Sequence, residues 1–224
     1  MKLLALSGWG QPPDALSGIM SEAQTLDYAR HGNVRDALQE LQGTYDAIIG
    51  WSLGGQMAVR AMAAGVLDAK KLVLIAAPYQ FVAMPALKLG MPQDVFAMFR
   101  AHYATDAGRM LAKSWASILK GDERHAKVRG MLELQDIETL AHLPWLNWLD
   151  VLEGFSCDRI DMSRLPPTLL LHGDNDAVVH HAQSQAFMEK LPQAKLVTFT
   201  QCGHAPHWHN PAGVTRAIED FLHG

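Results

Sequence analysis

The stretch Gly50-Trp51-Ser52-Leu53-Gly54-Gly55 decides the fold, because it fits the pattern G-x-S-x-G between a predicted strand and a predicted helix. Asp46 to Ile49 has the apolar composition of a short buried strand, and Leu53 to Ala64 is a helical pattern of small residues. A nucleophile on so sharp a turn needs neighbours without Cβ atoms, since the backbone there is strained and tightly packed. The alternative is a glycine-rich turn with an incidental serine. The flanking strand and helix favour Ser52 as a nucleophile.

Outward from this turn, short apolar runs alternate with helical patterns, which is typical of βαβ units and a parallel sheet. The expected strands are 2–6, 24–28 (weaker), 46–49, 71–75, 168–171 and 196–199, and the expected helices are 34–41, 53–64, 182–191 and 212–222. The alternation stops between residues 85 and 164, where the sequence is helical and rich in Met, Trp and Leu. We therefore predict an α/β fold with a mostly parallel sheet of about six strands. Residues 1–84 and 165–224 form its core, and residues 85–164 form a helical cap over the carboxyl ends of the strands, where such sheets bind ligands.

A serine nucleophile needs a base and an acid that orients the base. Of the 11 histidines, His204 is favoured because it follows the last predicted strand, on the same edge of the sheet as Ser52. His207 and His209 lie nearby and suggest a metal cluster, but no cysteine or carboxylate has ligand spacing with them, so we expect no metal. The acid is expected in the turn after residues 168–171, which offers Asp174 and Asp176.

An oxyanion formed at Ser52 needs two hydrogen-bond donors. The backbone N–H of Leu53, directly after the nucleophile, is the first candidate. The second is the backbone N–H of Trp9, in the loop Ser7-Gly8-Trp9-Gly10 after the first strand. That loop can also be read as a simple tight turn.

Composition excludes several classes of protein. The chain has 224 residues, 49% of them hydrophobic, with a net charge of −4, which argues against a nucleic-acid binder. No apolar run approaches the roughly 18 residues of a membrane span. Cys157 and Cys202 have neither zinc nor CxxC spacing, and we expect free, mostly buried thiols in a cytoplasmic protein. No cofactor is implied.

Four motifs together resemble the α/β-hydrolase family: Gly8-Trp9-Gly10, the 50–55 turn, His172-Gly173-x-x-Asp176 and Gly203-His204-Ala205-Pro206. The order Ser…Asp…His is that of the family. More narrowly, the turn and the Gly-His-Ala-Pro tetrapeptide resemble the pimeloyl-acyl-carrier-protein methyl ester esterases of biotin synthesis. That resemblance implies Ser52, Asp176 and His204 as the triad, because the aspartate follows the glycine by three residues. The chain departs from the pattern in having Ser7-Gly8 for His-Gly and in lacking a leading β-hairpin.

The predicted cap has a segregated charge. Seven basic residues stand between positions 100 and 129 against three acids, namely Arg100, Arg109, Lys113, Lys120, Arg124, Lys127 and Arg129. Such a patch is compatible with docking an acidic acyl carrier protein, although a solvated helix face is the ordinary alternative. Apolar cap residues could line an acyl pocket: Met91, Phe96, Met98, Phe99, Met110, Trp115, Trp145 and Trp148. Trp115 and Trp9 are the residues we expect to contact substrate.

The leading hypothesis is hydrolysis of a methyl ester on a carrier-bound acyl chain through an acyl-Ser52 intermediate. A generalist short-chain carboxylesterase without a protein partner is the second hypothesis. A non-catalytic binding module of the same fold is the third, and an intact triad argues against it.

Overall fold

The computed structural model describes all residues from 1 to 224 and contains one six-stranded sheet, in the order β2-β1-β3-β4-β5-β6. Every neighbouring pair is parallel, which confirms the predicted mostly parallel sheet. The strands are β1 (Leu3–Leu6), β2 (Gln24–Thr25), β3 (Gly43–Trp51), β4 (Leu67–Ile75), β5 (Thr168–Gly173) and β6 (Lys195–Phe199).

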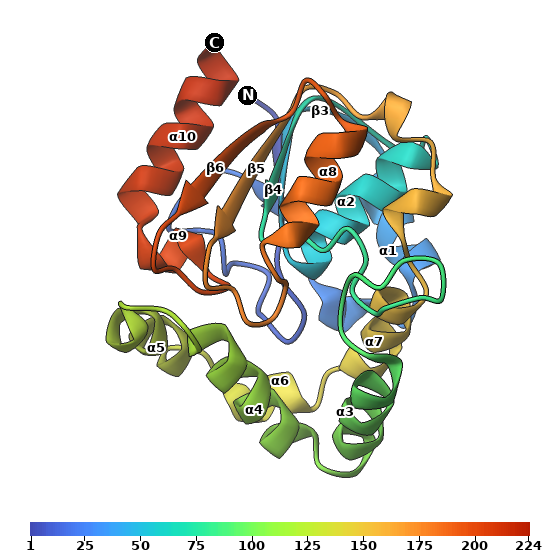
Figure 1. Cartoon of the computed structure of the whole chain (residues 1–224), viewed down its shortest axis with the longest axis vertical. Helices are drawn as coiled ribbons and strands as arrows, with labels where there is room; N and C mark the ends of the chain where they lie inside the picture. The colour runs from blue at the N-terminus through green and yellow to red at the C-terminus, as the bar shows by residue number, and fades with distance from the viewer.

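Helices cover both faces of the sheet (Figure 1). One face carries α1 (Val34–Glu40), α2 (Leu53–Ala63) and α8 (Ala182–Lys190), and the other carries α9 (Pro206–His209) and α10 (Pro211–His223). Two groups of buried side chains result, and they include Leu4, Ile48 and Leu74 on the α2 side and Ala5, Ile49 and Val73 on the α10 side. Successive residues of a strand point to opposite faces, which explains why the central strands are continuous apolar runs.

Between β4 and β5 the chain forms five α-helices and no strand of the sheet. They are α3 (Gln93–Thr105), α4 (Ala107–Leu119), α5 (His125–Glu133), α6 (Ile137–Ala141) and α7 (Trp145–Glu153). Two short 3-10 helices, η2 (Cys157–Arg159) and η3 (Met162–Arg164), lead back to the sheet, and a third, η1 (Tyr28–Arg30), follows β2. The five helices lie together beyond the carboxyl ends of the strands (Figure 1), and we refer to them as the cap.

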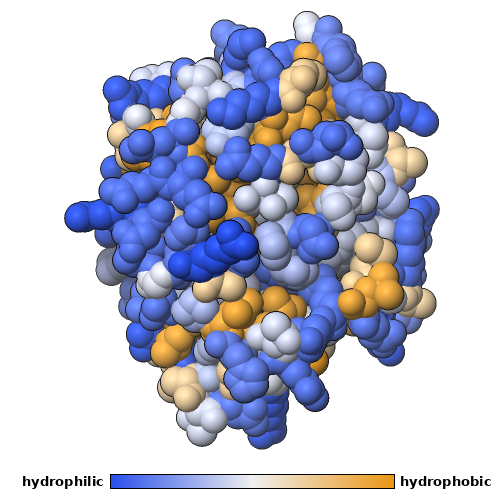
Figure 2. All heavy atoms as spheres, turned by 180° about the vertical axis from the view of Figure 1, so that it is seen from behind, coloured by the Kyte–Doolittle hydropathy of each residue, from blue (hydrophilic) through white to orange (hydrophobic).

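The face of the molecule opposite to that in Figure 1 is mostly hydrophilic. Seen from behind, hydrophobic residues reach the surface in separate patches among hydrophilic ones (Figure 2). None of the helices combines the length and the apolar character that crossing a membrane requires. Cys157 and Cys202 are both buried and free, as expected.

Candidate active site

Ser52 stands on the sharp turn between β3 and α2. Its backbone has φ 53° and ψ −117°, a conformation that L-residues rarely adopt. The glycines around it permit the turn, because a Cβ on Gly50 would lie 2.5 Å from Gly55 Cα, and one on Gly54 would collide with the Leu6 carbonyl oxygen. The turn therefore holds the serine at the amino end of α2, where the helix dipole favours negative charge.

His204 and Asp176 meet at the carboxyl edge of the sheet. The two residues follow β6 and β5, and His204 Nδ1 donates a hydrogen bond of 2.7 Å to Asp176 Oδ2. Asp176 Oδ1 accepts two more, each 2.8 Å long, from the backbone N–H groups of Val178 and Val179. Asp174 makes no contact with His204 and instead accepts a weak 3.4 Å bond from Cys202 N. The structure thus brings the histidine together with Asp176 and not with Asp174.

A second histidine supports the same carboxylate. His172 Nε2 lies 2.7 Å from the Val179 carbonyl oxygen and 3.2 Å from Asp176 Oδ2. A carbonyl oxygen only accepts, so His172 must carry its proton on Nε2, and Nδ1 accepts from the Ser184 hydroxyl at 2.6 Å. Burial would raise the pKa of Asp176, but the charge of His204 and the hydrogen bonds from His172 and His204 hold that pKa well below its usual range. Asp176 is therefore an ionised carboxylate.

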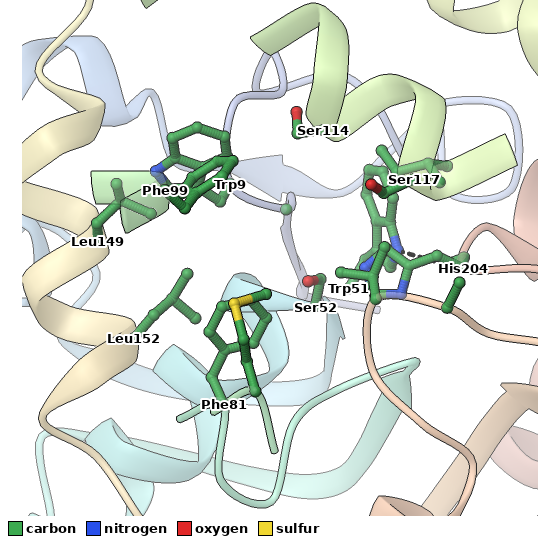
Figure 3. Close-up of a pocket in the computed structure, with 15 residues that line it drawn as sticks. Trp9, Trp51, Ser52, Phe81, Phe99, Ser114, Ser117, Leu149, Leu152 and His204 are labelled. Carbon is green, nitrogen blue, oxygen red and sulfur yellow. Dashed lines mark hydrogen bonds between the residues drawn. The ribbon is translucent and has the colours of Figure 1, made fainter. Parts of the chain in front are cut away.

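Ser52 and His204 share the wall of one cavity of about 130 Å³ (Figure 3). No hydrogen bond joins Ser52 Oγ to His204 in this structure, which is common before substrate binds. Because Nδ1 of His204 faces Asp176, Nε2 is the nitrogen left to exchange a proton. The loop position of His204 is secured by its own carbonyl oxygen, which accepts a 2.9 Å bond from Trp51 Nε1.

Of the two expected oxyanion donors, Leu53 directly follows Ser52 in the chain and Trp9 lines the same cavity as Ser52. Leu53 is the first residue of α2, so its N–H has no partner within the helix. Trp9 N makes no hydrogen bond to the protein, whereas its side-chain Nε1 donates to the Trp145 carbonyl oxygen at 2.9 Å. Trp9 lines the cavity, and its ring packs edge-on against Phe99 and Tyr103 of the cap. Both N–H groups are free to receive a negatively charged oxygen.

The cavity is mainly apolar, and no lysine, arginine or carboxylate lines it. Core and cap both contribute to the wall, which is formed by Gly8, Trp9, Trp51, Ser52, Phe81, Met91, Phe99, Ser114, Ser117, Ile118, Leu149, Leu152, Ala177, Val178 and His204. Of the apolar cap residues singled out in the sequence, only Met91 and Phe99 are among them. Met98 is 60% exposed, and Phe96, Met110, Trp145 and Trp148 are buried in the packing between cap and core.

Trp115 does not line the cavity, so its expected contact with substrate needs correction. Its neighbours on α4, Ser114, Ser117 and Ile118, do line it, at the i, i+3, i+4 spacing of one helix face. Each residue of a helix is rotated by about 100° from the one before, which turns Trp115 away from Ser114 and into the packing of both cores. The two serines are the functional candidates that we did not anticipate.

A separate group of possible metal ligands includes two residues of the segment that carries His204. One ligand atom from each of Asp122, Cys202 and His209 lies within 4.8 Å of the other two. The carboxylate comes from the cap, and for this reason sequence spacing did not suggest it. Both carboxylate oxygens already accept hydrogen bonds from protein N–H groups. The group is thus a hydrogen-bonded link between cap and core.

Comparison with known proteins assigns the family. The profile of the Alpha/beta hydrolase family matches residues 3–217, and the chain belongs to this family. The chain is similar to the pimeloyl-[acyl-carrier protein] methyl ester esterase of Nitrosomonas europaea, with 27% identity over 91% of this chain and 88% of the relative. A relative of the same name from Aromatoleum aromaticum is 26% identical over 99% of this chain and 98% of its own length.

A bromoperoxidase from Bacillus anthracis has the same fold. Its crystal structure superposes with a TM-score of 0.83 at 16% identity, covering all of this chain and 92% of that one. Family and relatives together make the chain a carboxylic ester hydrolase.

Proposed function

We propose that the chain is a serine esterase that hydrolyses the methyl ester of a carrier-bound pimeloyl chain in biotin synthesis. The observation that carries the mechanism is the His204–Asp176 hydrogen bond beside Ser52, at the wall of an apolar cavity. The names of the two relatives support the substrate. Both cysteines are free and buried, which fits a reducing compartment, so we place the reaction in the cytoplasm.

The geometry supports a two-step reaction. Ser52 Oγ attacks the ester carbonyl while His204 Nε2 takes the serine proton, and Asp176 stabilises the imidazolium that forms. The oxyanion of the tetrahedral intermediate accepts hydrogen bonds from Trp9 N and Leu53 N, each typically worth about 2.7–4 kcal/mol in the transition state. His204 then protonates the leaving methoxide, and methanol departs. Water attacks the acyl-Ser52 ester with His204 again as base, which releases the free acid and restores Ser52.

The absence of charged side chains from the cavity wall favours release of the product. The ester is neutral, whereas the product is a carboxylate, and no cation in the wall would retain it. The mainly apolar wall also suits the methylene chain of an acyl group.

Part of the basic region could receive the carrier. Arg109, Lys113 and Lys120 are exposed, make no ion pair and project from one stripe at the spacing i, i+4 and i+11. This stripe adjoins the α4 face that lines the cavity. Three of the other four basic residues are less available, because Arg100 pairs with Asp150 at 2.7 Å, and Arg124 and Lys127 each donate to the His209 carbonyl oxygen. Arg129 is exposed but lies on α5 rather than on this stripe.

A generalist short-chain carboxylesterase is the second candidate, favoured by this partial neutralisation of the basic residues. Purified protein should be given pimeloyl-acyl-carrier-protein methyl ester and, separately, the free methyl ester of pimelate. We expect kcat/KM for the carrier-bound ester to exceed that for the free methyl ester of pimelate by at least tenfold. Equal values would favour the generalist. Restored growth of a biotin-requiring strain that lacks its own esterase provides the cellular test.

A further inference from the structure

The cap contains a buried carboxylate that contacts the segment carrying His204. Asp122 lies between α4 and α5, and its side chain is fully buried. Its Oδ2 accepts a 2.9 Å bond from Gly203 N, the residue before His204. Its Oδ1 accepts from His209 Nδ1 at 2.8 Å and from Arg124 N at 2.7 Å. Two of its three donors thus belong to the core segment on either side of the proposed base.

The backbones of cap and core approach closely at this point. A Cβ on Gly203 would lie 2.8 Å from the Ile118 carbonyl oxygen and 3.3 Å from Asp122 Cβ. Gly121 has φ +83°, and a Cβ there would lie 2.6 Å from the Asn175 carbonyl oxygen. Glu123 N also donates to the Gln201 carbonyl oxygen at 2.9 Å. The turn at 119–124 therefore packs directly on the loops that carry Asp176 and His204.

His204 is held from three directions, and Asp122 supplies one of them. Asp176 orients the ring through Nδ1, and Trp51 Nε1 binds the carbonyl oxygen of His204. The peptide on the amino side of His204 is fixed by the Asp122 carboxylate through Gly203 N. Burying a carboxylate is costly unless it is hydrogen-bonded. The turn at 119–124 and the loop that carries His204 must therefore be in contact for Asp122 to be buried. A misplacement of about 1 Å in such a group can cost about a hundredfold in rate.

We propose that Asp122 is a positioning residue that aligns His204 from the cap. The inference rests on the role of His204 proposed above. It implies that seating of the cap and alignment of the base are one event, since α4 both lines the cavity and leads into Asp122.

The test is Asp122→Asn, which keeps the shape and removes the charge and one acceptor. The amide nitrogen must then face either Gly203 N–H or His209 Nδ1–H, both donors. In protein well below its unfolding midpoint, we expect kcat for a p-nitrophenyl ester to fall about tenfold or more, with KM nearly unchanged. The downfield proton resonance of the His204–Asp176 hydrogen bond should broaden or shift.

The matched control is Asp136→Asn. Asp136 is also a cap aspartate, but it bonds only within the cap, to Thr139 N at 3.1 Å and to the Thr139 hydroxyl. Its substitution should lower the unfolding midpoint slightly and leave kcat and the downfield resonance as in the wild type. If Asp122 had a merely structural role, Asp122→Asn would resemble Asp136→Asn in keeping the kcat and the downfield resonance of the wild type.

If Asp122→Asn does not fold, His209→Phe tests the same link, because it keeps a ring and removes one donor to the carboxylate. A loss confined to kcat in either variant supports the proposal. Wild-type kcat, or a change in KM alone, overturns it. His204→Ala distinguishes a failure of the proposed function from a failure of the positioning role. An active His204→Ala variant contradicts the role of His204 as base. An inactive His204→Ala variant together with a fully active Asp122→Asn variant contradicts only the positioning role of Asp122.

Discussion

The backbone of Ser52 is held in a conformation that costs of order 1–3 kcal/mol, which the surrounding packing must offset. Ser52→Ala removes only the side-chain oxygen from this turn and leaves the strain unchanged. We expect it to fold like the wild type and to lose ~10⁴-fold or more of kcat, because no other hydroxyl occupies the same position on the turn. Ester hydrolysis and near-ultraviolet circular dichroism on the same preparation check this. Retention of more than a few per cent of kcat by the folded variant would remove Ser52 from the mechanism.

The two neighbouring aspartates should differ sharply. Asp176 accepts from His204 and from two backbone N–H groups, whereas Asp174 accepts only one weak bond. Asp176→Asn should cost ~10³–10⁴-fold in kcat, since an amide nitrogen facing His204 favours the wrong tautomer. Asp174→Asn should cost less than about threefold, because its side-chain oxygen can still accept from Cys202 N. Comparable losses in the two variants would contradict the assignment of the acid.

Among single residues, the positions that follow strands located more of the candidate site than the helical patterns did. Ser52, His204 and the turn with Asp174 and Asp176 could be found because each follows a strand, and the carboxyl ends of parallel strands meet at one edge. Only the family resemblance selected Asp176 over Asp174. Asp122 and Ser114 could not be found, because no strand anchors the cap. A helical pattern shows which residues share a face but not which way that face points. The pattern therefore could not show that Ser114 lines the cavity while Trp115 does not.

Among the elements, α4 is the one whose charge can be tested separately from its packing. The triple variant Arg109→Glu, Lys113→Glu, Lys120→Glu reverses the exposed stripe. We expect a fall of about tenfold or more in kcat/KM for a carrier-bound ester and little change for a small neutral ester, because surface charge acts mainly on encounter. The wild-type reaction with the carrier-bound ester should also slow as salt rises, since screening acts over about 8 Å at physiological ionic strength.

Two outcomes would contradict this docking surface. Parallel losses for both substrates would mean that the cap was destabilised, and unchanged rates for both would make the stripe an ordinary solvated face. Glu133→Lys and Glu138→Lys, which alter exposed acids on α5 and α6 rather than on α4, serve as the control for charge change alone.

Two central strands were predicted too short, whereas the expected strand 24–28 is longer than β2, which spans only Gln24–Thr25. The apolar pattern located 46–49 and 71–75, whereas β3 spans Gly43–Trp51 and β4 spans Leu67–Ile75. The missed amino-terminal part of β4 alternates buried and exposed residues, with Asp68 and Lys70 facing solvent. A rule for strands buried on both faces detects only the part that helices cover.

For the molecule as a whole, the buried side chain of His207 makes the free energy of unfolding depend on pH. His207 has no hydrogen-bond partner for either ring nitrogen, and its ring packs between Trp51 and Trp208. Burial, together with the nearby His204, lowers the pKa of His207 from 6.5 to about 3. Between these values the unfolded chain binds a proton that the folded chain does not, so the free energy of unfolding decreases as pH falls.

His207→Phe should reduce this acid sensitivity. At about pH 4.5, two units below 6.5, the wild type should have lost about 2–3 kcal/mol through this residue, at ~1.4 kcal/mol per unit. Urea unfolding of both proteins at neutral pH and at about pH 4.5 measures the difference. The variant should lose less free energy of unfolding between the two conditions, and an equal loss in both proteins would show that His207 does not control the effect.

The cap leaves the sheet after β4 and returns at β5, and these two strands are hydrogen-bonded neighbours, with Ile75 opposite Leu171. An insertion whose ends lie so close together can be exchanged in evolution as a module, and substrate range can diverge while the nucleophile and its partners stay the same. The contact of Asp122 with Gly203 restricts that freedom. A transplanted cap has to bring a turn with an acceptor for this N–H group, so a chimera with a foreign cap should need residues 118–124 of this chain to recover its rate.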